Sequence, residues 1–271
     1  MIDRFHTVII GGGCLGTACA ISLAKKLNSG TNNICILEKG LLAGGISSRH
    51  SGIIRSANAS IQAATFAEQA NDIWRNIVDF WGVDIKPKCP GAIWIAKNDK
   101  KEAAKTWTNL EKNLNKANID FYRIKAKKIK NLTNNLIRIN EKEEIYFHEP
   151  NAMLFDPIEV RNEMYNAIKI NGIKLKENTR VTGFELKAGN KIKKIKTNHG
   201  SILAENIINA AGGWSPQIFE NINVKIPVSL QPVYVSNWLV SKNKLPQDLP
   251  IIADYINLSY FRTWRDGELH I

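Results

Sequence analysis

The chain has 271 residues, 44% of them hydrophobic, and its 37 Lys and Arg against 25 Asp and Glu give a formal net charge of +12. This length and hydrophobic content are typical of one large or two smaller folded domains. They exclude a disordered chain, a collagen-like or coiled-coil fibre and a small disulfide scaffold. No helix-turn-helix, zinc-finger or RNA-recognition pattern accompanies the lysines, so we expect a solvated basic surface and no nucleic-acid partner.

The chain begins with a β-α-β pattern. Residues 7–10 are a β-branched run, 11–13 are three glycines, and 15–27 carry apolar side chains at helical spacing up to a helix stop at 28–30. A second strand at 34–37 is apolar throughout, as in parallel strands buried on both faces. Because the glycines interrupt the apolar run, we expect no signal peptide and no transmembrane segment.

The four cysteines predict no metal site. Cys14, Cys19, Cys35 and Cys89 form no Cys-x-x-Cys pair and no zinc spacing. Cysteines in apolar surroundings are usually small buried side chains, which favours a reducing compartment. We therefore expect a cytoplasmic protein.

The middle of the chain mixes helices with short alternating strands. An apolar stripe predicts a helix over 61–81, followed by a strand at 92–96, a helix at 99–117 and strands at 120–124 and 144–148. Trp94 and Trp264 fall on such segments and are interpreted as core aromatic residues. The alternation indicates an antiparallel sheet.

A helix start at Asp156-Pro157 opens the last part, where strands are predicted at 173–176, 181–186, 192–197, 201–204 and 207–209. The whole pattern predicts an α/β fold, with a Rossmann-like domain interrupted by an inserted α+β domain that contains antiparallel sheet. We expect the Rossmann-like domain at 1–80 and 150–225, and the inserted domain, incomplete at its carboxyl end, at 81–149 and 226–271.

The strongest motif is Gly11-x-Gly13-x-x-Gly16, which follows a strand and opens a helix. A dinucleotide's pyrophosphate must lie close to a helix amino end, where free N–H groups and the helix dipole favour anions. Glu38 ends the second strand, where a carboxylate can accept both hydroxyls of a ribose. The motif with its flanking strands and acidic residue predicts a dinucleotide site.

Four stretches resemble the FAD-dependent oxidoreductases of the D-amino acid oxidase, glycine oxidase and sarcosine oxidase (beta subunit-like) family. They are the glycine motif at 8–16, the segment 36–52 that contains Glu38, the helix–strand unit of Asp156-Pro157 and residues 178–181, and the second glycine loop at 209–215. Gly213 stands where the family usually has proline.

The resemblance implies FAD as the cofactor. The residues that match the family's cofactor-binding stretches are Gly11, Gly13, Cys14, Leu15, Gly16, Glu38, Lys39, Ser47, Ser48, Arg49, His50, Val181, Ala210, Ala211, Gly212 and Trp214.

The resemblance also implies oxidation of the C–N bond of a small amino acid or N-methylated amino acid, of the D-amino acid, glycine or sarcosine class, by hydride transfer to flavin N5. A substrate carboxylate needs a fixed cation, preferably arginine. Arg55 and Arg262 stand where the resemblance puts such arginines and are the catalytic candidates. Electrons would pass to oxygen or to an electron-acceptor protein.

Two alternatives remain open. A 2-hydroxy acid oxidase of the 2-hydroxyglutarate type would need a base for the hydroxyl proton, and Arg55 cannot serve as one. The chain also stops at Ile271, before the segment with which family members cover the flavin. It is then either a truncated protein or a non-catalytic, partner-dependent flavoprotein subunit whose site a second chain completes.

Overall fold

Strand β1 (Asp3–Ile10), helix α1 (Cys14–Leu27) and strand β2 (Ile34–Leu37) form the β-α-β pattern that the sequence predicts. The computed structural model describes residues 2–27, 33–58, 60–99, 103–189, 191–240, 245–246, 248–263 and 268–270. The expected helix stop at 28–30 and Trp264 therefore lie outside the described residues. β1 and β2 pair in parallel, and all of β2 is buried, as apolar residues on both faces require.

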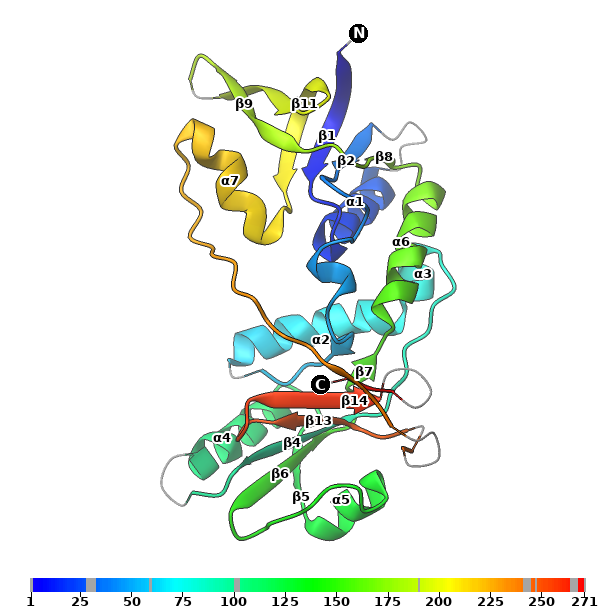
Figure 1. Cartoon of the computed structure of the whole chain (residues 1–271), viewed down its shortest axis with the longest axis vertical. Coiled ribbons are helices and arrows are strands. Elements are labelled where there is room, and N and C mark those ends of the chain that lie inside the picture. The colour runs from blue at the N-terminus through cyan, green and yellow to red at the C-terminus, as the bar shows by residue number, and fades with distance from the viewer. Residues whose placement is uncertain are drawn as a thin grey trace. The chain divides into compact units, whose positions relative to one another are not determined.

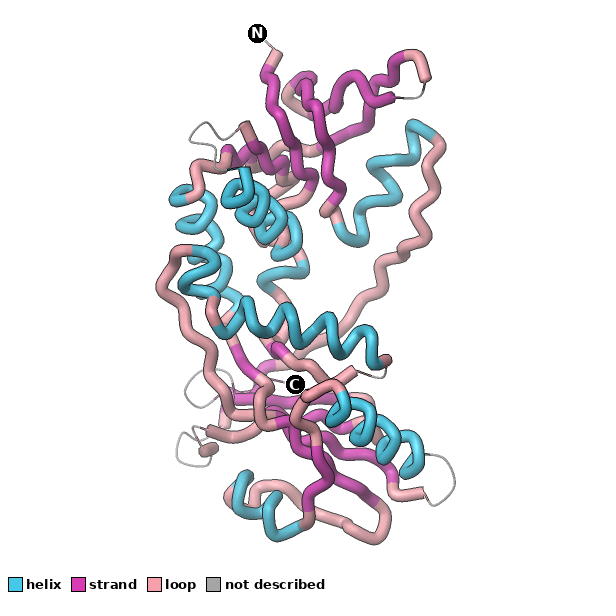
Figure 2. Tube along the Cα trace, turned by 180° about the vertical axis from the view of Figure 1, so that it is seen from behind, coloured by secondary structure: helices cyan, strands magenta, loops and turns pink. Residues whose placement is uncertain are grey.

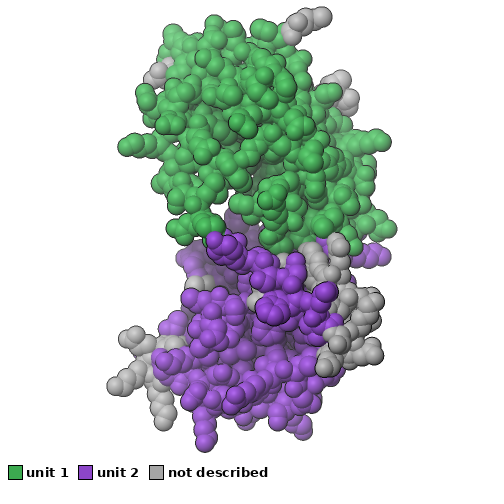
Figure 3. Space-filling view, in the orientation of Figure 1, with its two compact units in different colours: residues 1–50, 81–85, 157–232 green, residues 51–80, 86–156, 233–271 purple. Residues whose placement is uncertain are grey.

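The chain divides into two compact units, which Figure 3 colours separately. The first unit consists of Met1–His50, Trp81–Ile85 and Pro157–Pro232, and the second of Ser51–Phe80, Lys86–Asp156 and Val233–Ile271. The sequence pattern predicts residues 51–80 as part of the Rossmann-like domain. In the structure they belong to the second unit, because Ala57 and Ala64 pack into its core.

The first unit contains a sheet of six strands in the order β8-β2-β1-β11-β10-β9 (Figure 1). Strands β8 (Lys174–Lys176), β2, β1 and β11 (Gly200–Asn209) run parallel. β11 continues antiparallel into β10 (Lys191–Thr197) and β9 (Val181–Lys187). The two strands expected at 201–204 and 207–209 are one strand, because Asn206 between them still pairs with Thr7 of β1.

Helices cover the sheet of the first unit. Helix α1 contacts β1, β2 and helix α6 (Pro157–Ile170), and α6 also contacts the short helix η1 (Ile46–Ser48). A second core contains Val8 and Leu37 of the parallel strands together with Phe184 of β9. Ile218 and Phe219, at the end of α7 (Ser215–Phe219), pack against this core. The short helices η2 (Gly212–Trp214) and η3 (Glu220–Ile222) flank α7.

The second unit contains a sheet of seven strands in the order β12-β15-β14-β13-β4-β6-β5. Only β13 and β4 pair in parallel among these described strands. The strands are β4 (Ala92–Lys97), β5 (Tyr122–Ile124), β6 (Glu144–Glu149), β12 (Asn237–Leu239), β13 (Ile251–Asp254), β14 (Ser259–Thr263) and β15 (Glu268–His270). The short strands β3 (Ile53–Ile54) and β7 (Met153–Leu154) form a separate antiparallel pair.

Alternating residues of the seven-stranded sheet build two cores. Trp94 and Phe147 face one core, which includes Leu114 of helix α4 (Ala103–Lys116). Ile93 and Tyr146, the preceding residues of the same strands, face the other. Parallel and antiparallel sheets in one chain confirm the predicted α/β class with additional antiparallel sheet.

The helices of the second unit differ from the sequence prediction in two places. The single helix expected over 61–81 is broken at Asn76 into α2 (Ile61–Arg75) and α3 (Ile77–Trp81). Helix α5 (Ala126–Thr133) was not expected, because the lysines of 125–130 leave few apolar residues from which a helical stripe could be recognised. In the structure, Ile129 and Thr133 are its buried residues. Residues 224–236 form neither helix nor strand (Figure 2).

Over the described part of the chain, none of the helices combines the length and the hydropathy that a bilayer span needs.

Gly16 allows the first helix to lie against the turn after β1. A Cβ added at Gly16 would lie 2.0 Å from the carbonyl oxygen of Gly11. We expect Gly16→Ala to lower the free energy of unfolding by about 1–3 kcal/mol, because the helix must move away from the turn. Urea unfolding followed by circular dichroism measures this. Gly40→Ala is the control, since its Cβ would be 3.8 Å from the nearest atom, and equal stability of the two variants would contradict the packing argument.

Candidate functional site

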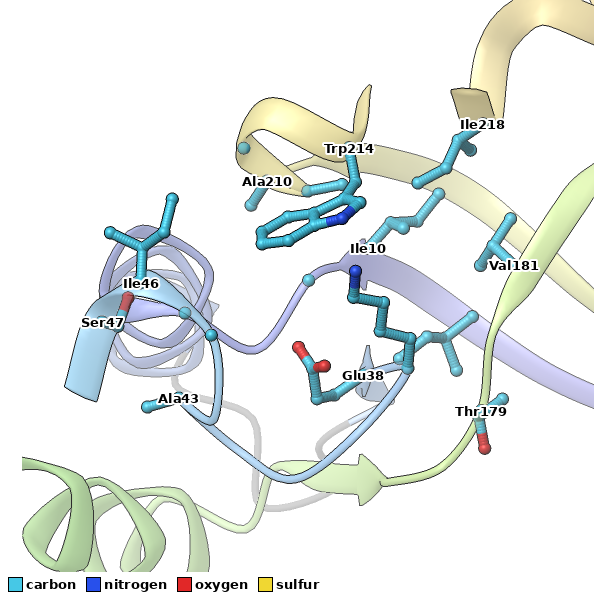
Figure 4. A pocket seen from close by; sticks show the side chains of 17 residues that line it. Ile10, Glu38, Ala43, Ile46, Ser47, Thr179, Val181, Ala210, Trp214 and Ile218 are labelled. Atoms are coloured by element: carbon cyan, nitrogen blue, oxygen red, sulfur yellow. The ribbon is translucent and has the colours of Figure 1, made fainter. Parts of the chain in front are cut away.

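A pocket lies at the carboxyl ends of three parallel strands in the first unit. β1 ends at Ile10, β2 at Leu37 and β11 at Asn209, and the residues that follow each strand line the pocket. Carboxyl ends of parallel strands meet at one edge, which is where open α/β sheets bind ligands. The lining residues are Ile10, Gly11, Gly13, Leu37, Glu38, Lys39, Ala43, Gly45, Ile46, Ser47, Thr179, Val181, Ala210, Ala211, Gly212, Trp214 and Ile218 (Figure 4).

The glycine turn after β1 is held tightly between the neighbouring strands. Gly11 has φ +106°, and its N–H donates to Leu37 O at 2.8 Å. The N–H of Ala210 donates to Ile10 O at 2.8 Å. A Cβ on Gly11 would lie 2.4 Å from Ala210 O, so the turn admits only glycine at this point. The backbone of the turn therefore reaches the pocket with no side chain over it.

The amino end of α1 points its first N–H groups toward the same pocket. The N–H of Cys14 donates to Ser47 Oγ at 3.0 Å, and a Cβ on Gly13 would lie 2.9 Å from that oxygen. Burial raises the pKa of the Cys14 thiol, which therefore favours its neutral form. A helix amino end lined by glycine and a serine hydroxyl is suited to an anion such as a diphosphate.

The Glu38 carboxylate is fixed at the end of β2. Its Oε2 accepts the N–H of Gly12 at 2.8 Å, and its Oε1 accepts the N–H of Gly40 at 2.9 Å. An ionised carboxylate has about four acceptor positions, so these two bonds leave capacity for the hydroxyls of a ribose. Both bonds also fix the direction in which a ligand would meet the carboxylate.

Trp214 forms the wall of the pocket opposite Glu38, as Figure 4 shows. The Nζ atom of Lys39 lies 3.5 Å from the centre of the Trp214 ring. Partial burial lowers the pKa of Lys39, and the charge of Glu38 opposes this shift. The ammonium group adds positive charge to a pocket that already contains a helix amino end, which favours a negatively charged ligand.

The structure brings most of the expected cofactor residues together and leaves some aside. Leu15 is 76% exposed, and Gly16 acts in the packing of α1. Of the sixteen expected positions, those that line the pocket are Gly11, Gly13, Glu38, Lys39, Ser47, Val181, Ala210, Ala211, Gly212 and Trp214. Those that do not are Cys14, Leu15, Gly16, Ser48, Arg49 and His50. Thr179 also lines it and lies in the 178–181 stretch, although only Val181 of that stretch was an expected contact. Ile218 lines it too and belongs to none of the four stretches.

A second pocket, of about 350 Å³, belongs to the second unit and contains Arg55. Small-molecule sites have volumes of roughly 300–1,000 Å³. The guanidinium carbon of Arg55 lies 4.9 Å from the centre of the Trp94 ring, and Nη1 donates to Ala57 O. Tyr255 stacks on Trp94 with ring centres 5.3 Å apart. Trp94, interpreted from the sequence as core alone, is buried and also lines this pocket beside Tyr260.

Arg262 does not reach this pocket. The side chain is only 3% exposed, and Nη1 donates to Thr263 O at 3.0 Å. Burial lowers the pKa of Arg262 to about 10, while the charge of Asp156 opposes the shift. Its place on β14 was expected from the sequence, but the residue faces the interior of the second unit and Arg262 does not line the pocket that contains Arg55.

The chain matches the family model described as FAD dependent oxidoreductase over residues 6–271. It is 27% identical over 276 residues to human mitochondrial dimethylglycine dehydrogenase, covering 98% of this chain and 30% of the relative. It is 28% identical over 238 residues to sarcosine oxidase subunit beta of Arthrobacter sp, covering 84% of this chain and 56% of the relative. The chain thus spans less than two thirds of the length of the curated relatives that it matches.

Among solved structures, L-proline dehydrogenase from P. horikoshii has the same fold over 100% of this chain and 70% of its own, with a TM-score of 0.84 and 23% identity.

Glu38→Gln tests the anchoring of the pocket's carboxylate. An amide has one acceptor oxygen, so one of the N–H groups of Gly12 and Gly40 would face an NH₂ group and lose its bond. We expect the free energy of unfolding to fall by about 1–2 kcal/mol in urea titrations without ligand. Glu205→Gln, on an exposed part of β11, should stay within about 0.5 kcal/mol of the unchanged protein. A Glu38 variant as stable as this control would contradict the bonding described.

Proposed function

The chain belongs to the FAD-dependent oxidoreductase family, and on that premise we propose that it oxidises the C–N bond of a small amino acid or N-methylated amino acid, of the D-amino acid, glycine or sarcosine class. FAD is the cofactor of this family. The observation that carries the proposal is the pocket at the strand ends, where the glycine turn, the amino end of α1 and Glu38 converge. Amino acid oxidation is also supported by the relatives, which are dehydrogenases and oxidase subunits acting on dimethylglycine and sarcosine.

The residues of the first pocket fit FAD in two places. The backbone of Gly11 and Gly13 lines the pocket at the amino end of α1, where a diphosphate would lie. Glu38 offers its remaining acceptor positions to the ribose hydroxyls. The sixteen expected cofactor residues remain proposed contacts. When bound, FAD supplies the acceptor for the hydride that leaves the substrate.

Arg55 is the proposed anchor of the substrate carboxylate. Its guanidinium has five N–H donors, more than the bond to Ala57 O uses, and its planar fork can bind a carboxylate through two parallel bonds. Trp94 and Tyr255, stacked on one another, would form an aromatic wall beside the carbon and nitrogen atoms of a small amine. A fixed carboxylate holds the reacting C–H bond in one direction, which is a positional contribution to the rate. Arg262 is buried near Asp156 and does not line this pocket, so Arg55 is the favoured anchor.

A second candidate function is a partner-dependent flavoprotein subunit. It is favoured by the similarity to a chain that is itself an oxidase subunit. In that case another polypeptide completes the flavin site, and this chain binds FAD without turnover. Oxidation of a 2-hydroxy acid is less favoured, because Arg55 cannot accept a hydroxyl proton whereas an amine can arrive deprotonated. The electron acceptor, oxygen or a protein, and the cytoplasmic location stay predictions from the sequence.

Anaerobic titration of the FAD-loaded protein with sarcosine, glycine and D-amino acids tests the proposal. At least one of these should bleach the flavin absorbance, and none doing so would contradict it. Arg55→Lys should lower kcat/KM by about 10–100-fold, mainly through KM, because lysine cannot form the two parallel bonds. Arg123→Lys, at an exposed position of β5, is the matched control and should behave as the unchanged protein.

A further inference from the structure

Glu149 is a buried carboxylate at the end of β6 with three N–H groups pointing at it. It is 1% exposed. Its Oε1 accepts the N–H of Ser56 at 2.6 Å and that of Ala57 at 2.9 Å. Its Oε2 accepts the indole N–H of Trp94 at 3.1 Å. Glu149 therefore binds the 56–57 backbone through Oε1 and the Trp94 indole through Oε2.

All three donors are neighbours of Arg55. Ser56 and Ala57 follow it directly in the chain, and the guanidinium donates to Ala57 O. Trp94 lies under the guanidinium, 4.9 Å from ring centre to guanidinium carbon. The direction of the Arg55 side chain thus depends on a backbone and a ring that the same carboxylate fixes.

Helix α2 fixes this loop from its other side. Asn71 donates to Ser56 Oγ at 2.6 Å, and Ser56 Oγ donates to Glu68. Glu68 in turn pairs with Arg75 at 2.7 Å. Among the described residues, the charged and titratable groups around the Glu149 loop include Arg55 on its own segment and Tyr255, which stacks on Trp94. They also include Arg75 of α2 with its two partners, Glu68 and Asp72.

The sheet does not need a carboxylate at this position. Ile145 and Phe147 precede Glu149 on the same face of β6, and both lie in the apolar core of Trp94. Burying an ionised carboxylate is unfavourable unless donors compensate it. An apolar residue at position 149 would continue the pattern of Ile145 and Phe147 on this face of β6. The role of the carboxylate is therefore indicated by its three hydrogen bonds.

We propose that Glu149 is a positioning residue for the substrate anchor: through the 56–57 backbone and the Trp94 indole it sets the direction of the Arg55 guanidinium. This inference rests on the proposed function, in which Arg55 binds the substrate carboxylate. Glu149 itself touches no substrate in this account.

The proposal gives stability and substrate affinity opposite dependences on pH. Burial raises the pKa of Glu149, against the opposing effects of the Ala57 and Ser56 N–H groups, Arg55 and Trp94. A carboxyl with a raised folded-state pKa contributes stability that is full below its unfolded pKa and lost as pH rises through the folded one. Positioning needs the ionised form, so affinity for sarcosine should rise over the same pH window.

The experiment compares Glu149→Gln and Glu149→Asp with Glu143→Gln, an exposed glutamate just before β6, as the matched control. The first readout is tryptophan fluorescence without substrate as pH is raised above the ordinary titration range of a glutamate. The unchanged protein should show a step that is absent in Glu149→Gln and in Trp94→Phe. The second is the apparent Kd for sarcosine from anaerobic flavin bleaching, which should rise about tenfold in Glu149→Gln and less in Glu149→Asp.

Two results separate the positioning role from the proposed function. If the unchanged protein and Glu149→Gln bind sarcosine equally well with the same pH dependence, the positioning role is wrong and the function stands. If no sarcosine binds while the fluorescence step is present and lost in Glu149→Gln, the substrate class is wrong and the link from Glu149 to Trp94 stands. Should Glu149→Gln fail to fold, a Glu149→Asp variant with unchanged affinity and an unchanged pH step would equally overturn the proposal.

Discussion

The close approach of α1 to the turn after β1 is the constraint on which the first unit depends. Only glycine at position 16 allows it, since a Cβ there would lie 2.0 Å from the carbonyl oxygen of Gly11. Glycine at position 11 in turn lets the turn pass Ala210, whose carbonyl oxygen would lie 2.4 Å from a Cβ there. This contact places the amino end of the helix at the edge where β1, β2 and β11 finish. This amino end suits a diphosphate, because Gly11, Gly13 and the Ser47 hydroxyl that accepts the Cys14 N–H line the pocket beside it.

Both pockets contain a loop that a carboxylate fixes by accepting its backbone N–H groups, and the carboxylate lies far from that loop in the sequence. Glu38 binds Gly12 across 26 positions, and Glu149 binds Ser56 across 93. Each fixes a loop that follows a strand, β1 in the case of Glu38 and β3 in the case of Glu149. Such bonds keep a loop in place without apolar burial, at an energetic cost that an apolar residue would avoid.

More of the first unit than of the second could be predicted from the sequence. The glycine motif, the flanking strands and Glu38 are local patterns with a geometric meaning, and the structure brings them together. Tyr255 and Tyr260 lie more than 150 positions after Trp94, and only the parallel pairing of β13 with β4 makes them neighbours. Arg262 was placed on the right strand, but whether an arginine on a strand faces a pocket or the interior depends on sheet register, which no single motif determines.

Comparison of FAD with FMN in binding titrations of the purified chain, followed by flavin fluorescence, tests the central claim most directly. FMN lacks the adenosine and one phosphate, the parts assigned to Glu38 and to the amino end of α1. The account predicts saturable binding of FAD and affinity for FMN at least about tenfold weaker, which corresponds to one lost charge-assisted bond or more. Equal affinities, or no saturable binding of FAD, would contradict it.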